Sequence, residues 1–144
     1  MMMQENEQRK LQSLLLQIRS YQDALQEIER QIAVTERALM EIIATISALT
    51  ELPKTKQSES FIPVGGGIYV KSEIKDKKNV IVSIGGGVCL EKTTTEAKAY
   101  LEKRKKELEA TDEKLREQAQ KISAELESAN KAAEDLYIKL QGEK

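Results

Sequence analysis

The stretch that decides the fold reads FIPVGGGIYV from Phe61 to Val70, and a related stretch reads IVSIGGGVCL from Ile81 to Leu90. Each apolar position of the first has an apolar counterpart twenty residues later. Alternating β-branched residues on both sides of a glycine break are typical of two strands joined by a tight turn. The sequence therefore predicts two β-hairpins of one design, with four strands at about 60–64, 68–74, 79–84 and 88–92. The matching apolar positions, which we expect to form the oligomerisation strands, are Ile62, Val64, Ile68, Val70, Val82, Ile84, Val88 and Leu90.

The glycine triplets Gly65–Gly67 and Gly85–Gly87 do not have the spacing of a phosphate-binding loop. A P-loop needs a Gly-Lys-Ser or Gly-Lys-Thr end, and a dinucleotide fingerprint needs a third glycine that opens a helix. Here each triplet leads into another predicted strand. We interpret the glycines as residues that supply a positive φ at a turn or bulge.

Apolar residues occupy both faces of the predicted hairpins. Phe61, Tyr69, Ile81 and Cys89 fall on the face opposite the eight matching positions. Isolated hairpins are marginally stable in water, and exposed edges invite pairing. We therefore expect an obligate oligomer, in which the strands of several subunits join a shared sheet or intersubunit β-barrel.

A heptad pattern precedes this region. Apolar residues recur at alternating steps of three and four from Leu11 to Leu49, and only Thr35 interrupts them. Sustained heptads indicate a coiled coil. We predict a helical arm over residues 5–51, which ends before Pro53 and whose coil frays before Leu11, where Gln and Glu enter the seam.

A second heptad pattern follows the hairpins. Thr93 and Glu96 have the spacing of a capping box, and the leucine-rich seam contains Lys105 and Asp112 near its start. We predict a second helical arm over residues 94–141. Two arms of similar length joined by a hub at 60–92 must run antiparallel. The predicted fold is mainly α: residues 1–144 form one subunit, a long antiparallel two-helix coiled coil with two small β-hairpins at its hub end.

Four apolar residues face outward near the chain ends in this register. Leu16 and Ile138 take positions that are mostly polar or charged in the other heptads, and Leu15 and Tyr137 flank the seam. Leucine is a good helix former, so Leu15 and Leu16 alone have a plain explanation. Two such pairs at one end of a coil suggest an exposed client-binding tip.

Composition excludes several classes of function. The 144 residues carry a net charge of −1 with no His, and aromatic residues make up 3%. Balanced charge gives no electrostatic case for nucleic acid or a membrane surface. A chain with a single Cys, no His and no paired nucleophile and base offers neither a metal centre nor an enzyme site, so we expect no cofactor and no catalysis. Without a signal peptide or an apolar span, we expect a cytoplasmic protein.

The chain resembles the alpha-class subunit of archaeal prefoldin. The resemblance lies in the Ile-Pro-Val-Gly-Gly-Gly and Ile-Gly-Gly-Gly-Val segments, the boundary Glu91-Lys92-Thr93 and the flanking heptad helices. It implies a hexamer of two alpha and four beta subunits built on paired β-barrels. It also implies an ATP-independent molecular chaperone, whose coiled-coil tips hold unfolded client proteins and pass them to a group II chaperonin.

Two other functions fit the same pattern. One is a filament-forming prefoldin-like structural protein that assembles without a beta partner. The other is a passive coiled-coil adaptor whose tips bind one folded protein. Client range, the residues that dock a chaperonin and assembly without a beta partner are not encoded in any motif of the sequence.

Overall fold

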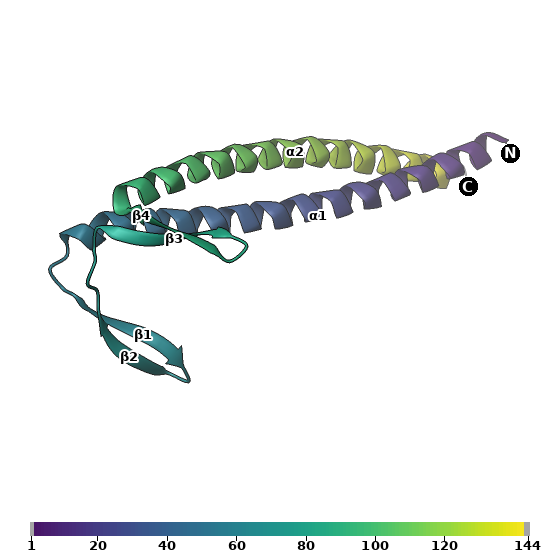
Figure 1. Ribbon diagram of the computed structural model, residues 1–144. Helices are drawn as coiled ribbons and strands as arrows, with labels where there is room; N and C mark the ends of the chain where they lie inside the picture. The colour runs from purple at the N-terminus through teal and green to yellow at the C-terminus, as the bar shows by residue number, and fades with distance from the viewer. Residues whose placement is uncertain (1, 143–144) are drawn as a thin grey trace. The chain divides into compact units, whose positions relative to one another are not determined.

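The computed structural model describes residues 2–142 of the chain (Figure 1). Helix α1 (Met2–Glu51) is followed by a short 3-10 turn, η1 (Leu52–Lys54), then by four strands and a second long helix. The strands and the second helix are β1 (Glu59–Gly65), β2 (Ile68–Glu73), β3 (Asn79–Gly85), β4 (Val88–Thr93) and α2 (Thr94–Gly142). The order of elements and the strand bounds agree with the prediction to within about a residue at each strand end.

The chain divides into two compact units. The arm unit contains the chain up to Arg37 and from Ala110 onward, and the strand unit is Ala38–Glu109. Each long helix contributes to both units. The arm unit is helical, whereas the strand unit holds both hairpins and the adjoining ends of α1 and α2.

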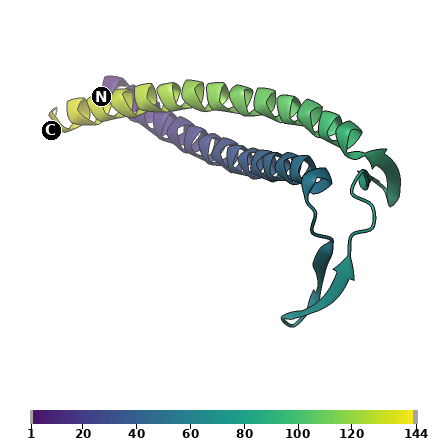
Figure 2. The ribbon, with the colours of Figure 1, turned by 90° about the vertical axis from the view of Figure 1, so that its left-hand side faces the viewer.

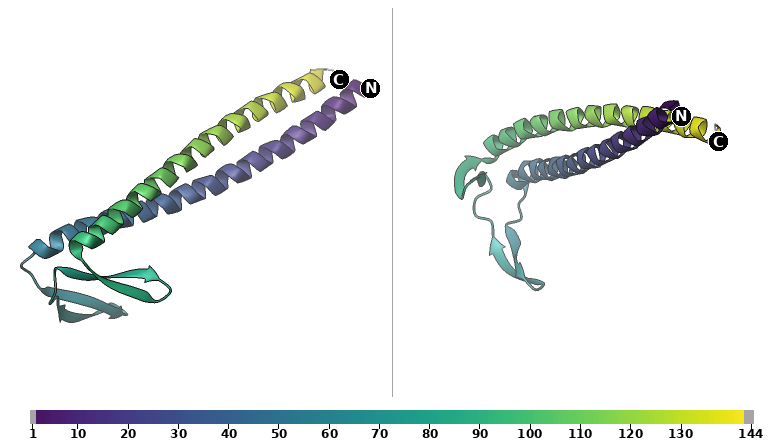
Figure 3. Two further views of the ribbon diagram at one scale, coloured as in Figure 1. Left: turned by 45° about the horizontal axis from the view of Figure 1, so that its top comes forward. Right: turned by 90° about the vertical axis from the view of Figure 1, so that its right-hand side faces the viewer.

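In the arm unit α1 and α2 run antiparallel. Figures 2 and 3 show the first turns of α1 beside the last turns of α2. Lys139 Nζ donates to Glu7 Oε1 at 2.7 Å, and Arg116 pairs with Glu36 further along the helices. Ile18 is buried with Ala129 and Ala133. Leu11, Leu14, Tyr21 and Leu126 pack against this cluster. The predicted seam and its direction are therefore confirmed.

The start of α1 differs from the prediction. The helix begins at Met2 rather than residue 5, and the expected fraying before Leu11 is wrong. Glu7 occupies a seam position, yet its Oε1 accepts from Lys139 of the opposite helix. An ion pair across the seam therefore continues the helix pair where apolar contacts end.

Other polar residues in or beside the seam also have partners. Thr35 is 8% exposed, and its hydroxyl donates to the Gln31 carbonyl at 2.8 Å. Asp112 Oδ2 accepts from Arg116 Nε at 2.9 Å. A hydrogen bond to the Glu125 carboxylate raises the pKa of Tyr21, because the anion stabilises the protonated phenol. Buried polar groups with partners cost little stability, which explains why the seam tolerates them.

The strand unit contains two separate antiparallel hairpins with the same pairing. In the first, Ile62 lies opposite Val70 and the register shifts between Pro63 and Gly65. In the second, Val82 lies opposite Leu90 and the shift falls between Ser83 and Gly85. The glycines at the centres of the turns, Gly66 and Gly86, have φ of +58° and +60°, a conformation that L side chains rarely adopt. Each bulge with its glycine turn confirms the interpretation of the triplets.

The second hairpin runs directly into α2. The Thr93 hydroxyl accepts from the Glu96 N–H at 3.1 Å and donates to Glu96 Oε1 at 3.2 Å. The predicted cap is present, but Glu96 reaches the Thr93 hydroxyl, since the backbone of Thr93 pairs with Asn79 in the sheet. Thr94 and Ala97 are buried just beyond the cap.

Candidate assembly strands and client-binding tip

The hairpins expose the apolar face that the sequence predicted for oligomerisation. Seven of its eight side chains are exposed, and Val82 is half-buried. Exposed fractions reach 64% for Ile68 and 61% for Val64. Each hairpin forms a two-stranded sheet of its own, so the expected barrel is not closed within one chain. Contiguous exposed apolar surface of this kind marks an interaction site.

The opposite face of the hairpins is also exposed. Phe61 is 58% exposed, Tyr69 61% and Ile81 75%, and Cys89 is a free thiol on the same face. This placement agrees with the two-sided pattern in the sequence. A two-stranded sheet with apolar side chains uncovered on both faces requires further protein for stability.

The four predicted tip residues are all exposed in the arm unit. Leu15 is 53% exposed, Leu16 71%, Tyr137 53% and Ile138 60%. They lie near the end of the helix pair where Glu7 meets Lys139. Met2 and Met3 are exposed as well, at 83% and 81%, and they belong to α1 rather than to a loose segment.

Two grooves flank the seam at this end of the arm unit. The larger, of about 500 Å³, has Leu14, Ala132 and Leu136 as its apolar lining. Its polar lining residues are Lys10, Ser13, Asp135 and Lys139. The smaller, of about 280 Å³, is lined by Gln4, Gln8, Leu11, Tyr137, Leu140 and Gln141.

Of the four predicted tip residues, Tyr137 lines the smaller groove, and Gln141 Nε2 donates to its hydroxyl at 2.9 Å. Sequence reasoning assigned Leu14 and Leu136 to the seam alone and missed that they also line an open groove. The signal was present in the sequence, because small Ala132 beside Leu136 leaves room there.

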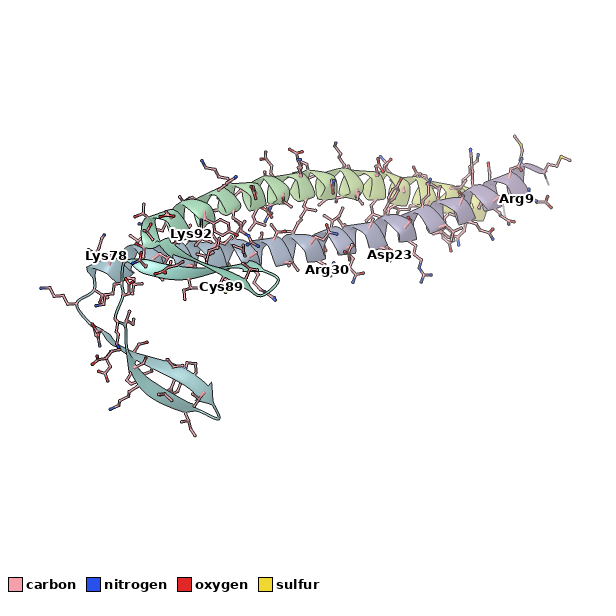
Figure 4. All side chains as sticks on the ribbon, in the orientation of Figure 1. Arg9, Asp23, Arg30, Lys78, Cys89 and Lys92 are labelled. Atoms are coloured by element: carbon pink, nitrogen blue, oxygen red, sulfur yellow. The ribbon has the colours of Figure 1, made fainter. Side chains whose placement is uncertain are left out.

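Three further exposed apolar residues on α1 were not singled out from the sequence. Val34, Met40 and Ile43 are 56%, 72% and 50% exposed. Elsewhere the outer surface of α1 is charged, and Figure 4 shows Asp23 and Arg30 projecting away from α2. Arg30 donates to Glu27 at 2.7 Å, and this contact, together with Gln31, holds the pKa of Glu27 at about 2.

Within residues 2–142 neither helix has a stretch apolar enough to cross a bilayer. The same part of the chain holds no group of three or more side chains suited to binding a metal ion.

Comparison with known proteins identifies a family. The family model for prefoldin subunits matches residues 21–139. A prefoldin subunit alpha from Methanospirillum hungatei is 35% identical over 94% of this chain and 91% of its own length. A prefoldin subunit alpha from Methanobrevibacter smithii is 33% identical over 94% of this chain and 92% of its own length.

The fold has a solved counterpart. A filamentous prefoldin from Methanocaldococcus jannaschii superposes with a TM-score of 0.67 at 20% identity, over 78% of this chain and 93% of that one. The heptad arms, the paired hairpins and these matches lead to one conclusion: the chain belongs to the prefoldin family and resembles the alpha subunits of archaeal prefoldins.

Proposed function

We propose that this chain is a subunit of an ATP-independent chaperone that captures unfolded proteins at the tip of its coiled coil and delivers them to a group II chaperonin in the cytoplasm. The observation that carries the proposal is the exposure of Leu15, Leu16, Tyr137 and Ile138 near one end of the helix pair. The prefoldin subunit alpha relatives support it.

The physical basis is multivalent, weak apolar contact. Unfolded chains present apolar segments of no fixed shape, so a binding site for them must be open rather than pre-formed. The four tip residues offer such a surface on an otherwise charged helix pair. Several tips in one complex would bind a client by effective concentration, so each contact can remain weak and releasable.

Assembly follows from the strand unit. The exposed face that contains Val64, Ile68 and Ile84 would become the inner face of a β-barrel shared with beta-class subunits, in a complex of two alpha and four beta chains. Burial in a barrel removes both the apolar surface and the sheet edges from water. Light scattering on this chain mixed with its beta partner tests that composition through the mass of the complex.

The tip is tested by replacing Leu15, Leu16, Tyr137 and Ile138 with Ser and measuring light scattering from a denatured client as it aggregates. We expect protection to fall several-fold while the mass of the complex stays unchanged. A matched control replaces Val34, Met40 and Ile43 with Ser, since these are equally exposed apolar residues elsewhere on α1. Equal protection by the tip variant and the control would reject the tip.

A second candidate is a filament-forming structural protein, and the fold match to a filamentous prefoldin favours considering it. Size-exclusion chromatography with light scattering on this chain alone separates the two functions. An open-ended polymer would support the filament, whereas discrete oligomers support the chaperone subunit. A passive adaptor would protect one partner only, so a panel of unrelated denatured clients distinguishes it from a chaperone.

A further inference from the structure

The two hairpins are alike on one face and different on the other. Their pairing coincides after a shift of twenty residues, so that Phe61 opposite Lys71 corresponds to Ile81 opposite Glu91. Residues directly opposite each other in a hairpin lie on the same face. The face without matching residues, which we name the variable face, contains Glu59, Phe61, Pro63, Tyr69, Lys71 and Glu73 in the first hairpin, and Asn79, Ile81, Ser83, Cys89, Glu91 and Thr93 in the second.

Each variable face has an apolar centre that is uncovered. Phe61 and Tyr69 are 58% and 61% exposed in the first hairpin, and Ile81 is 75% exposed in the second. A barrel that buries the other face of each hairpin would leave this surface still open to water. Burial of the aromatic pair against Ile81 and Cys89 would supply the apolar contact of an interface.

The charges on the two variable faces are complementary at equivalent positions. Lys71 of the first hairpin corresponds to Glu91 of the second, and both are exposed. At the root of the hairpins the pair Glu59 and Glu73 corresponds to the uncharged pair Asn79 and Thr93.

Contact between equivalent levels of two hairpins therefore discriminates between partners. Two first hairpins would place Lys71 against Lys71 and glutamates against glutamates. Two second hairpins would place Glu91 against Glu91. Only a first hairpin on a second hairpin brings Lys71 to Glu91 and sets the root glutamates against neutral residues. Like charges brought together across an interface suppress wrong pairings, and opposite charges favour the right one.

The connection between the hairpins separates them within one chain. Lys77 Nζ donates to the carbonyls of Thr55 and Gln57 at 2.8 and 2.9 Å. Asp76 accepts from the backbone N–H of Lys78 and Asn79, at 2.9 and 3.0 Å. These bonds hold a short, ordered linker, and the hairpins form separate sheets on either side of it (Figure 1).

We infer that the variable face of the first hairpin docks on the variable face of the second hairpin of another copy of this chain. Two copies then contact each other reciprocally through two equal interfaces, as two-fold symmetry requires. The matching faces remain available for the barrel. The inference rests on the proposed use of the hairpins as assembly surfaces, and it adds which hairpin recognises which.

Charge reversal tests this pairing in the full-length chain. We expect Lys71→Glu alone and Glu91→Lys alone each to weaken self-association about tenfold at low salt, as measured by sedimentation equilibrium. Mixing the two variants brings Glu at 71 against Lys at 91, and Lys71 against Glu91, in one pair of copies. The mixture should regain the wild-type affinity, and so should the double variant. Lys75→Glu, a matched charge change outside the strands, should have no effect.

Three results would overturn the inference. One is a wild-type chain that does not self-associate, and another is single variants with wild-type affinity. The third is rescue in the double variant without rescue in the mixture, since this would place the contact between hairpins of the same chain. Loss of the tip function changes none of these readouts, so failure here is distinguishable from failure of the proposed client binding. Circular dichroism of each variant confirms that the helices are retained.

Discussion

The arm unit and the strand unit satisfy their apolar residues in different ways. In the arm unit Ile18 is 9% exposed, because a second helix of the same chain covers it with Ala129 and Ala133. In the strand unit Ile68 is 64% exposed, and no second layer covers either sheet. The arm therefore carries its own partner within the chain, whereas the strands require other chains. This difference separates folding of the arms from assembly of the complex.

The sharpest way to break this comparison is to charge the strands alone. Val64→Asp with Ile84→Asp places one carboxylate on the matching face of each hairpin. We expect loss of assembly with the beta partner, since unpaired charges cannot enter an apolar barrel core. The measurement is the mass by light scattering, with helix content by circular dichroism as the check on the arms.

The outcome that contradicts the comparison is a joint loss of assembly and helix content. It would mean that the arms depend on the strands for their own folding. The control is Lys56→Asp, which introduces the same carboxylate in the exposed connection before β1.

Ile18→Ala removes the largest buried side chain of the arm seam cluster. We expect the free energy of unfolding to fall by about 2–3 kcal/mol, because the methyl groups lose their contacts and the two facing alanines are too small to fill the space. Urea denaturation followed by circular dichroism measures the change. Leu16→Ala is the matched control, since Leu16 is 71% exposed two residues away and should cost much less. Similar costs at both positions would argue against the seam.

The heptads were sufficient to predict most of the arm. The step between apolar residues identified the seam from Leu11 onward, and opposing directions followed from the shared hub. The start of α1 was missed because Glu7 reads as a seam defect in isolation. Its partner, Lys139, is 132 residues away, and nothing in the local pattern links the two.

The hairpins were predictable for a different reason. A glycine triplet between alternating β-branched residues leaves few alternatives, and its repetition after twenty residues supports the assignment. What the pattern did not indicate was the open groove beside Leu14 and Leu136, since groove shape depends on how side chains of both helices interleave. The identity of a client cannot be read from exposed leucines in either case. The tip residues therefore stay a prediction.

Thr35→Val sharpens the account of the seam at its one polar interruption. Thr35 is buried, and its hydroxyl only returns a hydrogen bond to its own helix at Gln31. Replacing the hydroxyl by a methyl group should raise the free energy of unfolding by about 0.5–1 kcal/mol. Thr45→Val is the control, because Thr45 makes the same bond to the Glu41 carbonyl at 2.8 Å but is exposed. A gain at both positions would assign the effect to helix propensity instead of burial.

Glu27 tests how much of the arm's stability lies outside the seam altogether. Its carboxylate accepts from Arg30 at 2.7 Å and from Gln31 at 3.2 Å, all on the exposed side of α1, and its pKa falls from 4.5 to about 2. A carboxyl group with a depressed pKa in the folded state stabilises that state in full above pH 4.5. The contribution is lost as the pH falls from 4.5 toward 2, when the folded carboxylate also binds a proton.

We therefore expect Glu27→Gln to lower Tm slightly at pH 7, and the difference from the wild type to disappear near pH 2. Salt should shrink the difference at pH 7, because water screens the contact poorly only at low ionic strength. Glu29→Gln controls for the loss of one negative charge nearby. A difference that persists below pH 2 would mean that Glu27 acts through packing and not through its charge. Because this contact lies within α1, it should be the same in the free chain and in the assembled complex, unlike every effect expected of the strands.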